Sequence, residues 1–326
     1  MHICLVIDAK LPIGLYGGNE RVAFSLGRSL FEMGHRITYL AQPSLIPFAN
    51  TIIFDKTRSI ESQIPKDVDL VHLHSDFPIL ENIPSCKTIH GNTREEKNFH
   101  PNSIFVSKSH AQNHNAKVFV YNGIDERDYG SVNFSSERNA FVFLGNASWR
   151  VKNIKGSIQV AKLANSKINI LGGSRFNLKK GFRFTFSSYA RFHGMVNDKV
   201  KSNFLNQARG LIFPVLWPEP FGLAIIESFY FGIPVFGTPY GSLSELVTQK
   251  TGFLSSSASE LAKAASKWKD YERSAIHNYW KNNFTAKIMA TNYLKYYEII
   301  LSGKTLHEGV IQSKSTRKID FLPWNP

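Results

Sequence analysis

The sequence predicts an α/β protein with two domains, and three observations lead to that prediction. Short apolar runs of strand length alternate with helical patterns along most of the chain. Residues 3–40 are typical of a strand, a glycine-rich loop, a helix and a second strand, and residues 210–236 show the same order. With 326 residues, 43% of them hydrophobic, the chain is long enough to fill two cores. We place the first domain at residues 1–125, a linker at 126–139 and the second domain at 140–283.

The first domain opens with Ile3–Asp8, an almost wholly apolar run that is typical of a parallel strand buried on both faces. A loop with Gly14, Gly17 and Gly18 follows, and then a helical pattern that ends at Gly34. Further strands are expected at residues 37–40, 51–54, 68–72, 86–89, 103–106 and 118–121. Their alternation with turn and helix signals predicts an alternating α/β domain.

The second domain follows a polar stretch without apolar periodicity, which is the reason for placing the linker there. A strand is expected at Ala140–Leu144, and a helix between Gly222 and Gly232. The remaining elements are strands at residues 168–171, 182–186, 191–194, 211–213, 235–236 and 251–254, a helix at 200–208, and helices from 259 onward.

The loop and helix after residue 213 carry the strongest chemical signal. The backbone amides of Phe221, Gly222 and Leu223 would lie at a helix N-terminus, which attracts phosphate. Glu219 precedes these amides in the loop, and Glu227 lies one helical turn past Leu223 on the same face. Because a carboxylate repels phosphate, hydroxyl groups are the partners that suit these two side chains. A phosphate with hydroxyls on both sides describes a nucleotide sugar.

This segment resembles the donor site of retaining glycosyltransferases of family 4. The resemblance is carried by Glu219-Pro220-Phe221-Gly222-Leu223, by Glu227 after seven intervening residues, and by Gly232-Ile233-Pro234-Val235 and Gly241. It implies that Glu219 contacts the donor sugar hydroxyls and that Glu227 holds the ribose. It further implies that the amides of Phe221, Gly222 and Leu223 meet the diphosphate and the sugar.

Three other segments extend the same resemblance. Gly17 and Gly18 resemble a family loop that approaches the donor phosphate, and His90 resembles a histidine that reaches the sugar beside the reacting carbon. Arg150 and Lys155, separated by four residues and followed by a glycine, resemble the pair that clamps the donor diphosphate. The sequence departs from the family at Asn146, because the arginine normally follows the strand-ending glycine directly. The resemblance thus implies catalytic roles for His90, Glu219, Lys155 and Arg150.

The resemblance covers roughly residues 1–300 and implies the GT-B fold, in which two Rossmann-like domains face a central cleft. Residues 284–326 would then form a helix that returns to the first domain, followed by a basic tail. The implied activity is retaining hexosyl transfer from a nucleoside diphosphate sugar to a hydroxyl of a glycan or lipid-linked acceptor, as in cell-surface polysaccharide or lipopolysaccharide synthesis. No cofactor is expected, since the nucleotide sugar is a substrate. The alternatives are a GT-B sugar-phosphate synthase and a nucleotide-sugar-binding relative with the same fold.

The basic charge of the chain indicates a polyanionic partner. Lysine and arginine outnumber aspartate and glutamate by 39 to 25, a formal net charge of +14. Nucleic acid and an acidic membrane face both attract such a charge. The sequence contains no RNA-binding, zinc-finger or helix-turn-helix pattern, so nucleic acid is not the expected partner. With no membrane span, no signal peptide and only Cys4 and Cys86 as cysteines, we expect a cytoplasmic protein that visits the inner face of the cell membrane.

Three side-chain patterns have spacings that metals use, although structural roles explain each of them better. Asp67 and Asp69 show a D-x-D spacing but introduce an apolar strand. His72 and His74 alternate on a strand, and a second histidine pair lies at positions 110 and 114 of an expected helix. The second pair has no carboxylate or cysteine nearby in sequence. We therefore expect no metal site.

Overall fold

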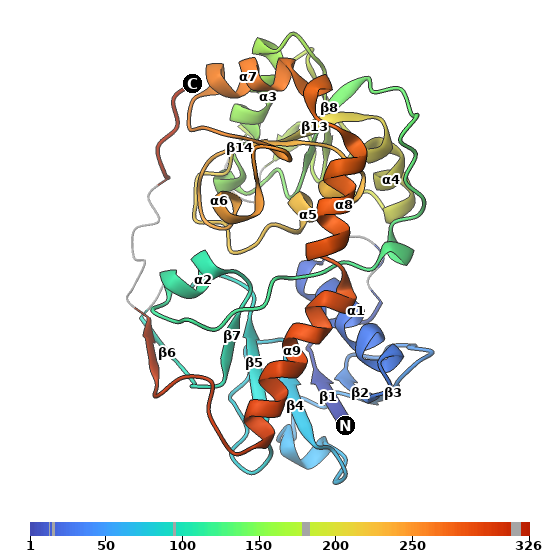
Figure 1. Cartoon of the computed structure of the whole chain (residues 1–326), viewed down its shortest axis with the longest axis vertical. Helices are drawn as coiled ribbons and strands as arrows, with labels where there is room; N and C mark the ends of the chain where they lie inside the picture. The colour runs from blue at the N-terminus through green and yellow to red at the C-terminus, as the bar shows by residue number, and fades with distance from the viewer. Residues whose placement is uncertain (13, 15–16, 94–95, 178–182, 314–320) are drawn as a thin grey trace. The chain divides into compact units, whose positions relative to one another are not determined.

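The structure is a computed structural model that describes residues 1–12, 14, 17–93, 96–177, 183–313 and 321–326 (Figure 1). The chain divides into two compact units. The first unit comprises Met1–Asp125 and Phe284–Lys318, and the second comprises Glu126–Asn283 and Ile319–Pro326. Residues 126–139 are thus part of the second unit.

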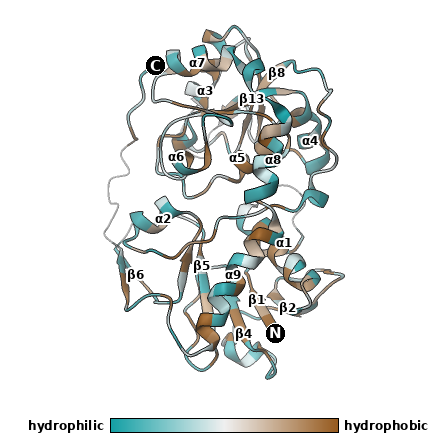
Figure 2. Ribbon diagram, viewed as in Figure 1, coloured by the Kyte–Doolittle hydropathy of each residue, from teal (hydrophilic) through white to brown (hydrophobic). Residues whose placement is uncertain are grey.

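The first unit is built on a six-stranded parallel sheet with the order β3-β2-β1-β4-β5-β7. The central strand β1 is fully covered, which fits its apolar sequence (Figure 2). Helix α1 (Gly18–Glu32) connects β1 to its parallel neighbour β2. The strands of this sheet are β1 (His2–Val6), β2 (Arg36–Ala41), β3 (Asn50–Ile53), β4 (Leu70–Leu73), β5 (Ser85–Ile89) and β7 (Ser103–Phe105).

The C-terminal helix α9 (Ala286–Leu301) belongs to the first unit and packs against α1, which confirms the expected returning helix (Figure 1). Its buried Tyr293 and Tyr297 hydroxyls bond to Thr88 and His72 of the sheet, at 2.8 and 2.7 Å. These contacts fix the helix on the sheet by polar as well as apolar packing. The smaller elements of this unit are η1 (Glu61–Gln63), β6 (Lys97–Phe99), α2 (Lys108–Asn113) and β16 (Ile311–Ser313), which pairs antiparallel with β6.

The second unit has a parallel six-stranded sheet with the order β12-β9-β8-β13-β14-β15. The strand order reverses between β8 and β13: β9 and β12 follow β8 on one side of the sheet, and β13, β14 and β15 lie on the other side. Open α/β sheets bind ligands at such a point. The strands are β8 (Ala140–Leu144), β9 (Ile168–Leu171), β12 (Ala190–Phe192), β13 (Ala208–Phe213), β14 (Val235–Gly237) and β15 (Gly252–Leu254), with a small hairpin of β10 (Phe176–Asn177) and β11 (Arg183–Phe184). The helices are α3 (Ile154–Leu163), α4 (Asp198–Asn206), α5 (Leu223–Tyr230), α6 (Leu243–Leu246), α7 (Ala258–Ser266) and α8 (Arg273–Asn283), with short 3-10 turns η2 (Glu126–Asp128), η3 (Arg150–Lys152) and η4 (Trp268–Asp270).

Two expected strands differ in the structure. The strand expected at 118–121 is wrong, because Phe119 makes only an isolated bridge to Phe105, where β7 ends. The chain turns into α2 two residues later, with the Ser107 side chain accepting a hydrogen bond from the His110 amide, so there is no strand left to pair with. Of the strand expected at 182–186, residue 182 lies outside the described residues and only the two residues of β11 pair.

Within the described part of the chain, every helix is too short or too polar to span a lipid bilayer.

Candidate functional site

The predicted site residues of the second unit lie on the loops that leave the carboxyl ends of β8 and β13 and in the helices α3 and α5 that follow them, beside the loop that leaves β14. These three strands are neighbours in the sheet, so their carboxyl ends meet at one edge. The β8 and β13 loops are joined by a hydrogen bond from the Leu216 amide to the Val151 carbonyl at 2.7 Å. The β13 and β14 loops are joined by a bond from the Ser242 amide to the Glu219 carbonyl at 2.9 Å. The sheet edge therefore carries one connected group of loops, named the edge loops below.

Gly241 allows the β13 and β14 loops to approach closely. Its φ is +63°, and a Cβ there would lie 2.3 Å from the Glu219 amide nitrogen. A side chain at this position would push the β13 loop away from the β14 loop. The sequence had indicated this glycine through the family resemblance, and the close approach is its physical reason.

Glu219 is buried and held by two donors. Its Oε2 accepts hydrogen bonds from the Lys152 ammonium and from the Trp217 indole nitrogen, each at 2.6 Å. The Lys152 and Glu219 side chains are only 10% and 7% exposed, so the ion pair is largely removed from water. Lys152 also lies over the ring of Phe213, 5.0 Å from the centroid. A buried charge pair with this geometry fixes the orientation of the carboxylate.

Glu227 is held in a matching way. Its Oε1 accepts hydrogen bonds from the Tyr129 hydroxyl and from the Lys201 ammonium, each at 2.7 Å. Lys201, the fourth residue of α4, also pairs with Asp198 at 3.0 Å. Tyr129 lies in the stretch expected to be a linker, and it contributes directly to this cluster.

Each glutamate thus receives a lysine and an aromatic donor on one oxygen atom. Among the hydrogen bonds of the described residues, those of Glu219 reach Oε2 and those of Glu227 reach Oε1. The second oxygen of each carboxylate is therefore left to accept a hydrogen bond from a ligand hydroxyl.

Helix α5 begins between the two glutamates. Its N-cap residue Gly222 has φ +79° and offers no side-chain acceptor to the amides of the first turn. A Cβ at Gly222 would lie 3.3 Å from the Glu219 Cγ, which places the Glu219 side chain against the helix start. The first-turn amides point along the helix axis and, with the helix dipole, favour an anion there.

The predicted basic pair occupies the β8 loop and the start of α3. Arg150 and Lys155 are both exposed, and Lys155 is the second residue of α3. The Arg150 guanidinium lies over the ring of Phe321, 5.1 Å from the centroid. It is Lys152, between the two predicted residues, that reaches Glu219. The roles of Arg150 and Lys155 at a diphosphate stay predictions.

Four side chains that the sequence did not indicate complete this arrangement: Lys152, Lys201, Trp217 and Tyr129. Each of them contacts one of the two predicted glutamates. The only local signal was for Lys152, which lies in the basic loop, and for Trp217, two residues before Glu219. Lys201 and Tyr129 are distant in sequence and join the cluster through the fold.

In the first unit, His90 directly follows β5, and Gly17 and Gly18 begin helix α1 after β1. Both positions lie on the carboxyl side of the first sheet, as expected of ligand-binding residues in an open α/β sheet. His90 Nε2 lies 3.1 Å from Nδ1 of His74, which follows β4 and is buried. Among the described residues, His74 Nε2 is buried without a partner, which favours the proton on Nδ1 and a hydrogen bond donated to His90.

Burial keeps three histidines of this unit neutral. It lowers the pKa of His90 to about 4, that of His72 to about 3 and that of His110 to about 3. At pH 7 the His90 ring is therefore a neutral group that can accept or donate a hydrogen bond.

These lowered pKa values predict that acid destabilises the first unit. The unfolded chain protonates histidine near pH 6.5, well above the pKa values of His72 and His110 in the fold, so the unfolded state binds more protons below pH 6.5. Stability is complete above pH 6.5 and falls by about 1.4 kcal/mol per pH unit for each such ring as the pH drops toward 4. Urea denaturation at pH 7.0, 6.0 and 5.0 measures this slope. His110→Phe removes one such ring and should therefore lower the slope of the unfolding free energy against pH by about 1.4 kcal/mol per pH unit. An unchanged slope in that variant would contradict the assignment.

The residues with metal-compatible spacing have structural partners. The Asp67 carboxylate pairs with Arg36, and the Asp69 carboxylate accepts a hydrogen bond from the His2 amide at 2.7 Å. His72 bonds to Tyr297 and Thr88, and His114 bonds to Ser313 at 2.8 Å. Within the described residues, no group of three His, Cys, Asp or Glu side chains is arranged to hold a metal ion.

Solved structures that are similar to this chain include glycosyltransferases and related synthases. AviGT4, a glycosyltransferase involved in avilamycin A biosynthesis, is 20% identical with a TM-score of 0.77, over 93% of this chain and 99% of that chain. Sucrose-phosphate synthase from Thermosynechococcus elongatus is 15% identical with a TM-score of 0.69, over 93% and 100% of the two chains. Anabaena HepE in complex with UDP-glucose is 14% identical with a TM-score of 0.64, also over 93% and 100%. The fold is GT-B.

Proteins with the GT-B fold catalyse different reactions, so the fold alone does not identify the reaction. The sequence comparison gives a further indication. Residues 125–285 match the family model of glycosyl transferases group 1. The matched region covers residues 126–283 of the second unit, which include Glu219, Glu227 and the edge loops. A search of curated proteins found no match. The GT-B fold and the group 1 match together support a glycosyltransferase.

Proposed function

We propose that this protein is a retaining glycosyltransferase of family 4 that uses a nucleoside diphosphate sugar as donor. The observation that carries the proposal is the pair of buried glutamates beside the start of α5, each with one oxygen atom left for a ligand. In this proposal Glu219 binds donor sugar hydroxyls and Glu227 binds the ribose. The similarity to Anabaena HepE, whose structure contains UDP-glucose, supports a donor of this class.

The leaving diphosphate would be stabilised by Arg150, Lys155 and the amides of Phe221, Gly222 and Leu223. A planar guanidinium, an ammonium group and helix amides each offer donors to a phosphate oxygen. They can neutralise the charge that develops as the glycosidic bond to the diphosphate breaks. The proposal therefore assigns no metal and no cofactor to the reaction.

Retention is proposed from the roles given to the side chains. An inverting enzyme needs a general base opposite the leaving group, and a double displacement needs a carboxylate nucleophile at the anomeric carbon. The resemblance assigns Glu219 to sugar hydroxyls and His90 to the neighbourhood of the reacting carbon, so neither serves as nucleophile. The departing phosphate oxygen can then accept the proton of the acceptor hydroxyl on the same face of the sugar.

The product anomer tests this function. With an α-linked donor such as UDP-glucose, the expected product is the α-glycoside, identified by NMR coupling constants of the anomeric proton. The reaction should proceed equally in EDTA, because arginine, lysine and helix amides replace a metal in this proposal. A β-glycoside would contradict both the mechanism and the family assignment, and loss of activity in EDTA that Mg²⁺ restores would contradict metal independence.

We further propose that the acceptor is a glycan or a lipid-linked sugar and that the protein binds the anionic inner face of the cell membrane. The formal charge of +14 supports this, because each basic residue near an acidic lipid surface contributes about 1 kcal/mol. Flotation with vesicles of phosphatidylglycerol and phosphatidylcholine, but not of phosphatidylcholine alone, is the expected result. High salt should release the protein. Equal flotation with both vesicle types, or with neither, would contradict the electrostatic attachment.

A second candidate is a sugar-phosphate synthase with the same donor site. The fold similarity to sucrose-phosphate synthase, over 93% of this chain, supports this second candidate. The two functions differ in the acceptor alone. Release of nucleoside diphosphate that depends on a sugar phosphate, and not on a glycan, would select the synthase.

A further inference from the structure

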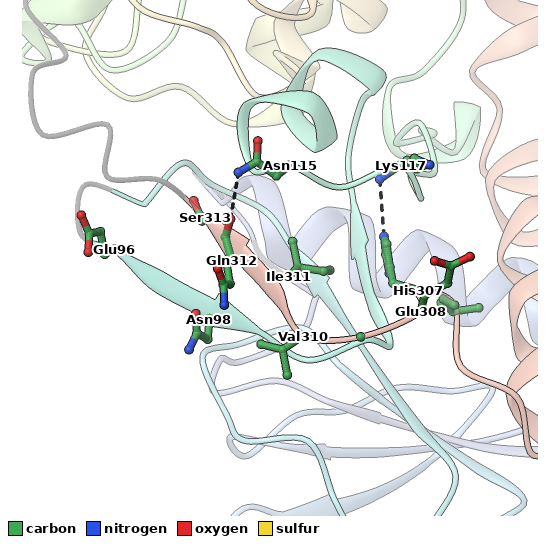
Figure 3. Close-up of a pocket in the computed structure, with 12 residues that line it drawn as sticks. Glu96, Asn98, Asn115, Lys117, His307, Glu308, Val310, Ile311, Gln312 and Ser313 are labelled. Carbon is green, nitrogen blue, oxygen red and sulfur yellow. Dashed lines mark hydrogen bonds between the residues drawn. The ribbon is translucent and has the colours of Figure 1, made fainter.

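The chain after α9 contacts the first unit before it reaches the second. Residues 306–313 line a hollow of about 870 Å³ on the first unit, beside the β6–β16 pair (Figure 3). Two hydrogen bonds join this stretch to the rest of the first unit: the Asn115 side-chain amide donates to the Gln312 carbonyl at 2.9 Å, and the His307 ring donates to the Pro101 carbonyl at 2.7 Å. These bonds attach the tail to the first unit.

The last six residues, 321–326, lie on the second unit. The Asn325 amide donates to the Ser256 carbonyl, and the Ala258 amide donates to the Asn325 carbonyl, both at 2.8 Å. The side chain of Trp324 packs against the apolar core of this unit. This end of the chain, named the terminal segment, is thus anchored where α7 begins.

The terminal segment also contacts each of the three edge loops. The Leu322 amide donates to the carbonyl of Leu216, three residues before Glu219, at 2.9 Å. The Tyr240 hydroxyl, beside Gly241, donates to the Pro323 carbonyl at 2.5 Å. On the β8 loop, the Phe321 ring lies under the Arg150 guanidinium. One short segment therefore touches the loops that carry the predicted sugar-binding and diphosphate-binding side chains.

These contacts have a consequence for ligand binding. Arg150 is exposed, and a long exposed side chain loses conformational freedom when it binds an anion. An aromatic ring under the guanidinium holds the side chain in one place beforehand without using its N–H donors, which remain for phosphate oxygens. The bonds at Leu216 and Tyr240 limit the movement of the loops on either side of Glu219 in the same manner.

We infer that the terminal segment is a positioning element of the donor site, in which Phe321 orients Arg150 and residues 322–323 hold the edge loops. The inference rests on the proposed function, because it assigns the segment to the same site. The segment organises the part of the site that binds the diphosphate, whereas Glu227 binds the nucleoside.

Point variants of Phe321 test the inference with UDP and ADP as probes. Phe321→Leu should weaken the binding of UDP or ADP about two- to fivefold in calorimetry, because the ring under Arg150 is lost. Binding of uridine or adenosine should not change, since these ligands have no phosphate. Phe321→Tyr keeps the ring and should bind as the intact protein does. Phe253→Leu is the matched control, because Phe253 is 39% exposed, close to the 46% of Phe321, and lies on β15.

Two further variants address the edge loops. Tyr240→Phe removes the hydroxyl that bonds to Pro323, and removal of residues 321–326 removes all the contacts at once. With an active donor and acceptor pair, both should lower kcat more than they raise KM, because the loss concerns groups that act on the leaving diphosphate. The truncated chain also exposes the core surface that Trp324 covers, so its thermal unfolding is measured alongside, and the point variants carry the test if it unfolds.

The possible outcomes separate the two proposals. Unchanged binding of UDP and ADP and unchanged kcat in Phe321→Leu and Tyr240→Phe would overturn the inference and leave the proposed function standing. A loss for uridine as large as that for UDP would also overturn it, because it would indicate a general structural effect. If the intact protein binds no nucleoside diphosphate and no nucleoside diphosphate sugar, whether the base is uracil, adenine, guanine, cytosine or thymine, the proposed function fails and the inference fails with it.

Discussion

Replacing Lys152 by methionine is expected to lower the unfolding free energy of the second unit by about 3 kcal/mol and to reduce sugar transfer at least tenfold. Breaking a buried ion pair by removing one partner strands the other charge, which costs about 3–5 kcal/mol. Lys152 and Glu219 form such a buried ion pair, since both side chains are almost fully buried and the Lys152 Nζ lies 2.6 Å from the Glu219 Oε2. The rate should fall because the carboxylate loses the partner that fixes its orientation.

A double variant separates stability from activity. Lys152→Met with Glu219→Gln removes both charges, so most of the stability should return, because the neutral pair leaves no charge stranded. Activity should stay low, since the amide of glutamine no longer offers a charged acceptor to a sugar hydroxyl. Urea denaturation followed by tryptophan fluorescence and the transfer assay give the two readouts.

The control for this experiment is Lys155→Met. Lys155 is exposed on α3, so the stability of this variant should stay within about 0.5 kcal/mol of that of the intact protein. If Lys152→Met is as stable as Lys155→Met, the buried pair does not stabilise the second unit in the way described. If the double variant regains full activity, Glu219 does not act through its charge.

The arrangement of strands was largely predictable because it depends on local patterns. Buried parallel strands such as His2–Val6 and Ala140–Leu144 are continuous apolar runs, which the sequence displays directly. The start of α5 was predictable for a similar reason, since Pro220 and Gly222 mark a loop and an eight-residue helix follows. The expected strand at 118–121 failed because an apolar run becomes a strand only where a neighbouring strand extends beside it.

The partners of the glutamates were not predictable from local patterns. Lys152 lies 67 positions before Glu219, and Tyr129 lies 98 positions before Glu227. A lone lysine or tyrosine at such a distance looks like any other surface residue in the sequence. Only the order of strands in the sheet brings these segments to the same edge. The two glutamates themselves were identifiable because their spacing within one loop and one helix is local.

Replacing Glu227 by alanine is expected to weaken binding of UDP or ADP about a hundredfold or more. In the proposed function its free oxygen accepts hydrogen bonds from ribose hydroxyls, and hydrogen bonds to a charged group are worth about 1.5–3 kcal/mol each. Lys201 keeps Asp198 as a partner at 3.0 Å, so the variant should fold with a smaller loss of stability than Lys152→Met. Tyr129→Phe retains the carboxylate and should cost much less affinity. Glu272→Ala, an exposed glutamate of the same unit, is the matched control and should bind as the intact protein does.

The ribose assignment itself is tested by changing the ligand together with the protein. The intact protein should bind 2′-deoxy-UDP or 2′-deoxy-ADP about tenfold more weakly than the ribose forms, because Glu227 then lacks one hydroxyl partner. The Glu227→Ala variant should bind the ribose and deoxyribose forms equally, since the group that distinguishes them is gone. This coupling between one side chain and one hydroxyl does not depend on any general loss of stability, because the same variant is compared on two ligands. Equal discrimination by the intact protein and by Glu227→Ala in calorimetry would contradict the assignment of Glu227 to the ribose.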